Sequence, residues 1–327
     1  MSISQKFKRA ASWGVFIGAW AGAVVQAAEF PDKQVTIVVP YAAGGFTDQV
    51  ARAIAPVLAE KWGKPVVIDN RPGGGTTIGT ALVARAPADG HTLLLSSLGY
   101  LTNPLMMPRL PYDPQDLKPL MMVSESPSVL YVGKQVPANN LAEFASYMRA
   151  NDGKVAFASS GVGSSPHICA EMLASAVGAH IIHAPYRGNA PALNALMAGE
   201  VAALLDAPSS VSYVQAGRMK VLGVASDKPV RSALPLTPFS QSSAPELKPY
   251  SCSSFFGFFM PAKVPAALQQ RIYRDLRAVV EVPTVAEGVT RPGGELHLLG
   301  PEDFTSYLDA QRPRWAAVIR EKHITQE

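Results

Sequence analysis

The amino-acid sequence predicts an α/β protein organised in two lobes. β-type runs alternate with amphipathic segments along most of the chain, which indicates mostly parallel sheets flanked by helices. Small residues, chiefly glycine and serine, fill the loops that follow the strands. The chain has 327 residues, of which 48% are hydrophobic and 17% charged. This length and composition suit two globular domains that each bury a core.

The N-terminal segment 1–27 is predicted to be a signal peptide that is cleaved near Ala27. Lys6, Lys8 and Arg9 precede an apolar stretch with a small-x-small end, the order typical of secretory signals. A membrane anchor is the alternative, but the apolar stretch is shorter than the roughly 20 residues that a spanning helix needs. We expect an exported, soluble protein. Without this segment the formal net charge falls from +4 to about +1, so charge does not favour a nucleic-acid partner.

The first unit of the mature chain is a β-type run at 34–39, a glycine loop and a helix expected to begin at Thr47 or Asp48. Apolar residues recur at helical spacing: Val50, Ile54, Val57 and Leu58. The first turn of such a helix leaves N–H groups unpaired at the positive end of the dipole, where an anion is stabilised. Asp48 is interpreted as a structural N-cap or first-turn acid that satisfies these groups.

The same order of strand, small-residue loop and helix returns along the chain. The next unit has a strand at 65–69, a triple-glycine loop and a helix with Ile78, Leu82 and Val83 on one side. A turn and another strand follow in PADGHTLLLSS, and from Ser124 the spacing changes. The later expected elements are strands at 128–132, 154–158, 201–206 and 255–260, helices capped by Asn139 or Asn140, by Ser165 before Pro166 and by Asn189, a loop at 234–254, and helices near 265–281 and 301–322.

The change of spacing at Ser124 divides the predicted elements into two lobes. We assign residues 28–127 and 255–327 to the first lobe and 128–254 to the second. The crossings, near 124–132 and 250–260, form the expected hinge. If the C-terminal helices pack on the first lobe, two strands join the lobes, and such a hinge suits closure on a ligand in the cleft.

Loops of small residues stand before helix starts in both predicted lobes, at 43–47, 75–77 and 159–164. Two helix N-termini that face each other across a cleft offer N–H and hydroxyl donors to both ends of a dianion. None of the loops fits the phosphate motif G-x-x-x-x-G-K-[ST] or the dinucleotide motif G-x-G-x-x-G. The simpler interpretation is that they only form tight turns. Arg187, at the mouth of another loop, is a candidate partner for a carboxylate.

Catalytic signatures are absent from the sequence. There is no G-x-S-x-G elbow and no H-E-x-x-H motif, and the six histidines are scattered. Ser165, His167 and Asp206 are residue types that a hydrolase uses, but any chain of this size contains such a set, and His167 is most simply a polar wall residue. We expect no catalysis, no cofactor and no metal. Cys169 and Cys252 form either a disulfide or two buried thiols.

Six phrases cover nearly the whole mature chain: FPDKQVTIVVPYAAGGFTDQVAR, WGKPVVIDNRPGGGTTIGTALVARAPADGHTLL, NPLMMPRLPYDPQDL, FASSGVGSSPHICAEML, HAPYRGNAPALNALMAGEVAALLDAPSS and AGRMKVLGVAS. In this order they resemble the Bug-type (TctC-like) periplasmic solute-binding receptors of tripartite tricarboxylate transporters. The resemblance implies a two-lobed, type II periplasmic-binding-protein fold without catalysis. It also implies that main-chain amides, hydroxyls and bridging waters hold the ligand carboxylates in the cleft.

The resemblance and the loop pattern together select the candidate ligand-binding residues. The first-lobe loop falls at Ala43 to Asp48 and the second-lobe loop at Ser159 to Ser165. The complete set is Tyr41, Ala43, Gly44, Gly45, Phe46, Thr47, Asp48, Thr76, Thr77, Ser97, Ser159, Ser160, Gly161, Ser164, Ser165, His167, Tyr186, Arg187, Asp206 and Ala207.

Three departures from the family pattern bear on the ligand. This chain has LPLTPFSQSSAP where many relatives read roughly LPDVPTVAEAG, and its glycine loop has Thr76-Thr77 where an asparagine is commoner near Thr77. Phe46 adds an aromatic residue to the first loop. We therefore hypothesise a ligand with a flat or apolar body, such as an aromatic carboxylate.

The expected function is a periplasmic receptor that binds a small carboxylate between two lobes and delivers it to inner-membrane transporter subunits. The resemblance implies these partners and a monomeric state. A secreted hydrolase that acts on an ester or carboxylate is the alternative, and it predicts turnover of the ligand.

Overall fold

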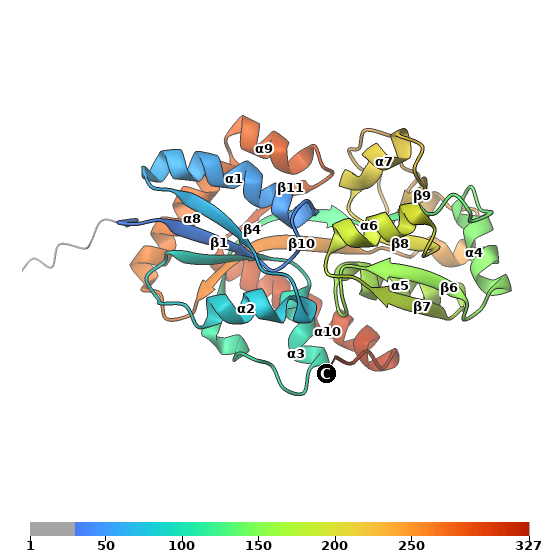
Figure 1. Cartoon of the computed structure of the whole chain (residues 1–327), viewed down its shortest axis with the longest axis horizontal. Coiled ribbons are helices and arrows are strands. Elements are labelled where there is room, and N and C mark those ends of the chain that lie inside the picture. The colour runs from blue at the N-terminus through green and yellow to red at the C-terminus, as the bar shows by residue number, and fades with distance from the viewer. Residues whose placement is uncertain (1–29, 327) are drawn as a thin grey trace, which may run out of the picture.

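The computed structural model describes residues 30–326, which form two α/β lobes side by side (Figure 1). Each lobe has one β-sheet with helices packed on it. The predicted two-lobed α/β fold is confirmed, and the predicted signal peptide lies outside the described residues. None of the helices in this range combines the length and apolar composition that a bilayer span requires.

The first lobe contains a six-stranded sheet with the order β11-β4-β10-β3-β1-β2. The strands β1 to β4 run in one direction, and β10 and β11 run in the opposite direction. The bounds are β1 (Val35–Val39), β2 (Val66–Asn70), β3 (Thr92–Ser96), β4 (Leu117–Pro127), β10 (Ser253–Pro261) and β11 (Glu295–Leu299).

Both faces of this sheet are buried, which is why its strands read as nearly continuous apolar runs. Ile37 and Val39 of β1 belong to the core under α1, α8 and α9, whereas Val38 belongs to the core under α2, α3 and α10. The helices are α1 (Phe46–Trp62), α2 (Thr77–Ala84), α3 (Gly99–Met106), α8 (Ala266–Val280), α9 (Pro283–Thr290) and α10 (Pro301–Glu321).

The second lobe contains a five-stranded sheet with the order β7-β6-β8-β5-β9, in which only β5 opposes the other strands. Its strands are β5 (Val129–Val132), β6 (Val155–Ser159), β7 (Ile181–Pro185), β8 (Ala203–Asp206) and β9 (Lys220–Val224). Its helices are α4 (Leu141–Ala150), α5 (Ser165–Val177), α6 (Asn189–Ala198) and α7 (Val211–Gln215). Short 3₁₀ helices lie at Gly74–Thr76, Pro114–Asp116, Pro208–Ser210, Phe239–Gln241 and Pro245–Leu247.

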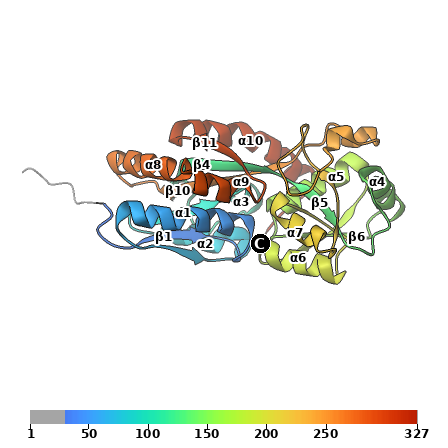
Figure 2. The same ribbon diagram turned by 90° about the horizontal axis from the view of Figure 1, so that it is seen from above.

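Two extended segments cross between the lobes. β4 continues into β5 through Ser128, and the return segment passes through Cys252 into β10. Ser128 N donates to Cys252 O at 2.8 Å, so the crossings are hydrogen-bonded side by side. After β10 the chain remains in the first lobe up to α10, which packs along β4 (Figure 2). The end of α10 also contacts α5 of the second lobe, where Ser175 Oγ donates to Glu321 Oε1 at 3.3 Å. The lobe limits and the hinge assigned from the sequence stay a prediction.

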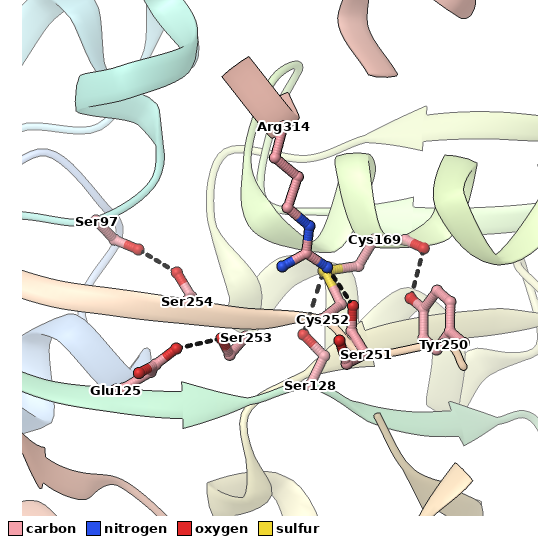
Figure 3. Close-up of a disulfide and its surroundings, with 10 residues drawn as sticks. All are labelled: Ser97, Glu125, Ser128, Cys169, Tyr250, Ser251, Cys252, Ser253, Ser254 and Arg314. Atoms are coloured by element: carbon pink, nitrogen blue, oxygen red, sulfur yellow. Dashed lines mark hydrogen bonds between the residues drawn. A yellow bond between two sulfur atoms is a disulfide. The ribbon is translucent and has the colours of Figure 1, made fainter. Parts of the chain in front are cut away.

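A disulfide joins the second lobe to the crossing. Cys169 of α5 and Cys252 are bonded with Cα atoms 5.9 Å apart (Figure 3). Tyr250 Oη donates to Cys169 O at 2.7 Å, and Ser128 Oγ lies 3.4 Å from Cys169 Sγ. The sequence left a disulfide and two free thiols as alternatives, and the structure contains the disulfide.

Candidate functional site

A small cavity of about 40 Å³ lies where the two lobes meet. Its wall is formed by loops and helix starts of both lobes and by the strands that cross between them. The lining residues are Tyr41, Gly45, Phe46, Thr47, Ser97, Ser126, Ser128, Ser160, Ser164, Ser165, Pro166, Asn189, Leu205, Asp206, Ala207, Ser254 and Phe256.

The lobes touch around this cavity. Gly188 of the second lobe has φ +128°, and a Cβ atom there would lie 2.8 Å from Ala42 Cβ of the first lobe. Thr102 Oγ1 of α3 donates across the lobes to Gly163 O at 2.7 Å. These contacts leave no room for a side chain at Gly188, and they join the two lobes directly at this point.

The N-terminus of α1 forms the first-lobe side of the cavity. Its N-cap is Gly45, and the first intrahelical bond runs from Gln49 N to Gly45 O at 3.0 Å. The N–H groups of Phe46, Thr47 and Asp48 precede that bond and have no intrahelical acceptor. The helix begins at Phe46, one residue before Thr47 and two before Asp48, the two predicted starts, because glycine in extended conformation ends the loop at Gly45.

The N-terminus of α5 forms the opposite side. The sequence predicted Ser165 to be the N-cap, which was wrong: Ser164 is the N-cap, and Ser165 is the first residue of α5. The Ser164 hydroxyl donates to Gly161 O at 2.6 Å and does not cap the helix. The first intrahelical bond runs from Ile168 N to Ser164 O at 3.0 Å, and Pro166 has no N–H. The N–H and hydroxyl of Ser165 therefore remain as donors at this end. Two helix N-termini, one from each lobe, thus border one cavity, as the loop pattern predicted.

Serines of the crossing strands form the floor, and sequence reasoning missed them. Ser126 lies in β4 and pairs with Ser254 of β10, whereas Ser128 lies at the junction between β4 and β5. Ser97 Oγ and Ser254 Oγ lie 2.5 Å apart (Figure 3). The alternation S-E-S-P-S at 124–128, in an otherwise apolar strand, is the one signal that could have drawn attention to Ser126 and Ser128.

The hydroxyl of Tyr41 adds a neutral donor to this wall. Burial raises the pKa of Tyr41 to about 12, against hydrogen bonds from Ser96 and Ser97 that lower it. Tyr41 therefore keeps its proton at neutral pH. None of the described residues that line the cavity is Lys, Arg or His, so an anion here depends on dipoles and hydroxyls.

Asp48 is structural, as interpreted from the sequence. Its side chain is buried and accepts hydrogen bonds from Gly44 N at 2.8 Å, Arg52 Nε at 2.8 Å and Asn70 Nδ2 at 3.1 Å. Burial alone would raise its pKa, but the hydrogen bonds from Arg52, Gly44 and Asn70 outweigh burial and lower it. Asp48 therefore fixes the loop before α1 and lies outside the cavity.

Asp206 lies inside the cavity wall at the end of β8. It is 4% exposed, and it accepts hydrogen bonds from Asn189 Nδ2 and, at 2.7 Å, from Ser210 Oγ. The sequence predicted Asn189 to be an N-cap. That was wrong: Gly188 is the N-cap, and Asn189 is the first residue of α6. With φ +128° at Gly188, the chain turns so that the amide of Asn189 reaches Asp206.

The histidines of this lobe do not complete a catalytic triad. His167 Nδ1 accepts from Gly163 N at 3.1 Å, and its ring stacks on His183 with centroids 3.5 Å apart. Burial lowers the pKa of His167 to about 3 and that of His183 to about 4. His183 Nε2 contacts Ser159 Oγ at 2.6 Å. Neither ring is hydrogen-bonded to Ser165, and within residues 30–326 no cluster of His, Cys, Asp or Glu is arranged to hold a metal.

The other candidates fall into two groups. Thr76, Gly161, Tyr186 and Arg187 line a neighbouring pocket of about 420 Å³, which also includes Tyr41 and Ser160 of the cavity wall. Ala43, Gly44, Asp48, Thr77, Ser159 and His167 line neither space. Thr77 Oγ1 donates to Gly74 O at 2.8 Å and so closes its own turn.

The chain is similar in sequence to known proteins of one family. The family model described as the tripartite tricarboxylate transporter family receptor, TctC, matches residues 50–324. The UPF0065 protein in the tcbD-tcbE intergenic region of Pseudomonas sp. strain P51 is 34% identical over 298 residues, which cover 90% of this chain and 88% of that protein. Protein BugT of Bordetella pertussis is 31% identical over 316 residues, which cover 94% of this chain and 95% of BugT.

Solved structures agree with the sequence relatives. The periplasmic binding protein BugD superposes with a TM-score of 0.84 at 30% identity, over 91% of this chain and all (100%) of that chain. Rpa4515 of R. palustris with adipate superposes with a TM-score of 0.83 at 30% sequence identity, over 90% of this chain and 99% of that chain. MatC from Rhodopseudomonas palustris with bound malate superposes with a TM-score of 0.81 at 28% sequence identity, over 89% of this chain and 100% of that chain. The chain therefore belongs to the tripartite tricarboxylate transporter receptor family.

Proposed function

We propose that the protein is a periplasmic receptor that captures a small carboxylate between its lobes and delivers it, as a monomer, to tripartite tricarboxylate-type transporter subunits. The observation that carries this proposal is the meeting of two helix N-termini, from α1 and α5, at one cavity without a basic side chain. Such N-termini stabilise anions through N–H groups and the helix dipole. Membership of the receptor family supports the same proposal.

The ligand class follows from the donors. Main-chain N–H groups and hydroxyls suit carboxylate oxygens, and a donor set on each lobe suits a ligand with two acidic ends. The structures of Rpa4515 with adipate and MatC with malate support an aliphatic dicarboxylate. The proposed ligand-binding residues are the predicted candidates that line the cavity, together with Ser126, Ser128, Asn189 and Ser254.

A binding role without catalysis is the better supported alternative. His167 accepts from Gly163 N, and Asp206 accepts from Asn189 and Ser210, so neither is hydrogen-bonded to Ser165 or to the other. A hydrolase needs its nucleophile and base within hydrogen-bond reach. We therefore propose that the ligand leaves the protein unchanged.

A thermal-shift screen of the mature protein from Ala28 tests the proposal. The compounds are C4 to C6 dicarboxylates, citrate, benzoate, phthalate and terephthalate. At 100 times its Kd, a ligand stabilises the folded state by roughly 2.7 kcal/mol, which raises the Tm by about 5 °C. The proposal predicts that at least one carboxylate produces this shift and is recovered intact. Consumption of the compound favours the hydrolase, and no shift with any carboxylate contradicts the ligand class.

Phe46 tests whether the ligand has an aromatic body. Its side chain lines the cavity, is 3% exposed and packs on Phe256 with ring centroids 4.4 Å apart. Phe46→Ala removes one wall, so we expect aromatic carboxylates to bind at least 10-fold more weakly while malate changes less. The substitution also opens the core and costs about 3 kcal/mol of stability, so Kd is measured by calorimetry below the Tm, with Phe46→Leu as the control that keeps the core filled. If Phe46→Ala bound every ligand with the affinity of the parent, the hypothesis of an aromatic ligand would be wrong.

A further inference from the structure

Asp206 places an acidic group inside a site arranged for anions. It is the last residue of β8 and lines the same cavity as the first turns of α1 and α5. The lining contributed by the described residues includes no Lys, Arg or His. A buried carboxyl group without a cationic partner normally lowers its energy by taking up a proton.

The hydrogen bonds to Asp206 allow either protonation state. Asn189 Nδ2 donates to Oδ1, and Ser210 Oγ donates to Oδ2 at 2.7 Å. Both donors are neutral, so neither compensates a negative charge. When Asp206 is protonated on Oδ2, the contact with Ser210 persists with its direction reversed, because a hydroxyl both donates and accepts. Protonation therefore requires no rearrangement of this cluster.

A carboxylate bound in the cavity lies close to Asp206. The cavity is about 40 Å³, so any anion in it is a near neighbour of the Asp206 side chain. Like charges at such separation in a buried site disfavour the doubly ionised state. We propose that Asp206 takes up one proton when a carboxylate ligand binds. The inference rests on the proposed function, because the coupling exists only if the ligand is an anion.

The surrounding titratable groups do not supply the missing positive charge. On the elements that pack against β8 and across the cleft they are Tyr131 of β5, His167 and Glu171 of α5, and Tyr41, Asp48 and Arg52 of the first lobe. Burial keeps His167 neutral near pH 7 by lowering its pKa to about 3. Arg52 is bound to Asp48 at 2.8 Å. The strand β6 and the helix α6, which also pack against β8, contain no titratable residue.

The sign of the pH dependence follows from this coupling. Burial raises the pKa of Asp206 to about 6, against hydrogen bonds from Ser210, Ala207 N and Asn189 that lower it. The free protein is therefore ionised at Asp206 above pH 6, and a bound anion raises this pKa further. Between the free and bound pKa values binding consumes a proton, so affinity falls as pH rises, by at most tenfold per unit.

Calorimetric titrations with malate and adipate at pH 6.0 and 8.0 test the inference. Ligand carboxyls with ordinary pKa values near 4 stay ionised in this window, so their own titration contributes little. We expect the Kd of the parent protein to rise at least tenfold from pH 6.0 to 8.0. In the Asp206→Asn variant, a neutral isostere, the Kd is expected to change less than twofold between pH 6.0 and 8.0. This variant should also bind the ligand more tightly than the parent at pH 8.0. Asp227→Asn, an exposed change in the same lobe, keeps the parental pH dependence.

Proton uptake is measured directly by repeating the titration at pH 7 in phosphate and in Tris. A binding enthalpy that depends on the buffer for the parent, and not for Asp206→Asn, supports the inference. Binding by the parent that is constant within twofold across the pH range overturns it, as does weaker binding by Asp206→Asn at both pH values. If neither protein binds any carboxylate of the screen, the proposed function itself fails, and the inference fails with it.

Discussion

Replacing Ser165 by aspartate is expected to weaken carboxylate binding by at least 100-fold while the protein stays folded. The new carboxylate would occupy the α5 end of the cavity, where Ser165 presents its N–H and hydroxyl. Two like charges about 4 Å apart repel by about 4 kcal/mol at an effective dielectric of 20, and a 100-fold loss corresponds to about 3 kcal/mol. An acid in the first turn also stabilises a helix by about 0.3 to 1 kcal/mol. Affinity and stability should therefore change in opposite directions, as measured by calorimetry and urea unfolding.

Two matched variants separate charge from structure. Ser165→Ala removes one hydroxyl and should weaken binding only a few-fold, in line with about 1 kcal/mol for one hydrogen bond. Ser212→Asp adds the same charge to the exposed first turn of α7 and should leave the Kd unchanged. If Ser165→Asp bound the ligand within tenfold of the parent, the α5 terminus would not be part of the site.

Loss of the disulfide is expected to cost about 4 kcal/mol of stability. Cys169 and Cys252 are 83 positions apart, and in the chain-entropy model a closed loop of this length restricts the unfolded state by about 4 to 5 kcal/mol. The Cys169→Ser, Cys252→Ser double variant should therefore unfold at a markedly lower urea concentration, with a somewhat larger m-value because its unfolded state is less compact.

Treatment of the parent with reductant provides the control for this variant. It should lower the unfolding midpoint of the parent toward that of the double variant, and it should leave the double variant unchanged. A midpoint that stays within the error of the parental value would show that α5 and the crossing segment are held by their packing alone.

Much of the fold was predictable because its signals are local. Apolar periodicity and glycine loops located the starts of α1 and α5 to within one or two residues, since helix starts depend on a few neighbouring residues. The structural role of Asp48 followed for the same reason: its first-turn position brings its side chain close to Gly44 N of the preceding loop and to Arg52 one turn further on.

The missed residues depend on contacts between distant segments. Ser126 and Ser254 reach the cavity only because β4 and β10 pair as they cross between the lobes. Neither strand indicates its partner, and a buried serine in a strand is compatible with many environments. Asn189 was assigned to a cap because that role needs only local sequence, whereas its contact with Asp206 depends on how α6 packs against β8.

The cavity can be regarded as a solvation shell that the protein divides between two bodies. Water surrounds a free carboxylate with hydrogen-bond donors, and here α1 contributes its donors from one lobe and α5 from the other. Contacts such as Thr102 with Gly163 hold the halves together. Any force that separates the lobes would therefore remove half of the shell at once, and water would replace it. In the proposed function, release to a partner then requires no competing ligand, only the opening of the shell, and the proton that Asp206 takes up on binding is returned to water in the same step.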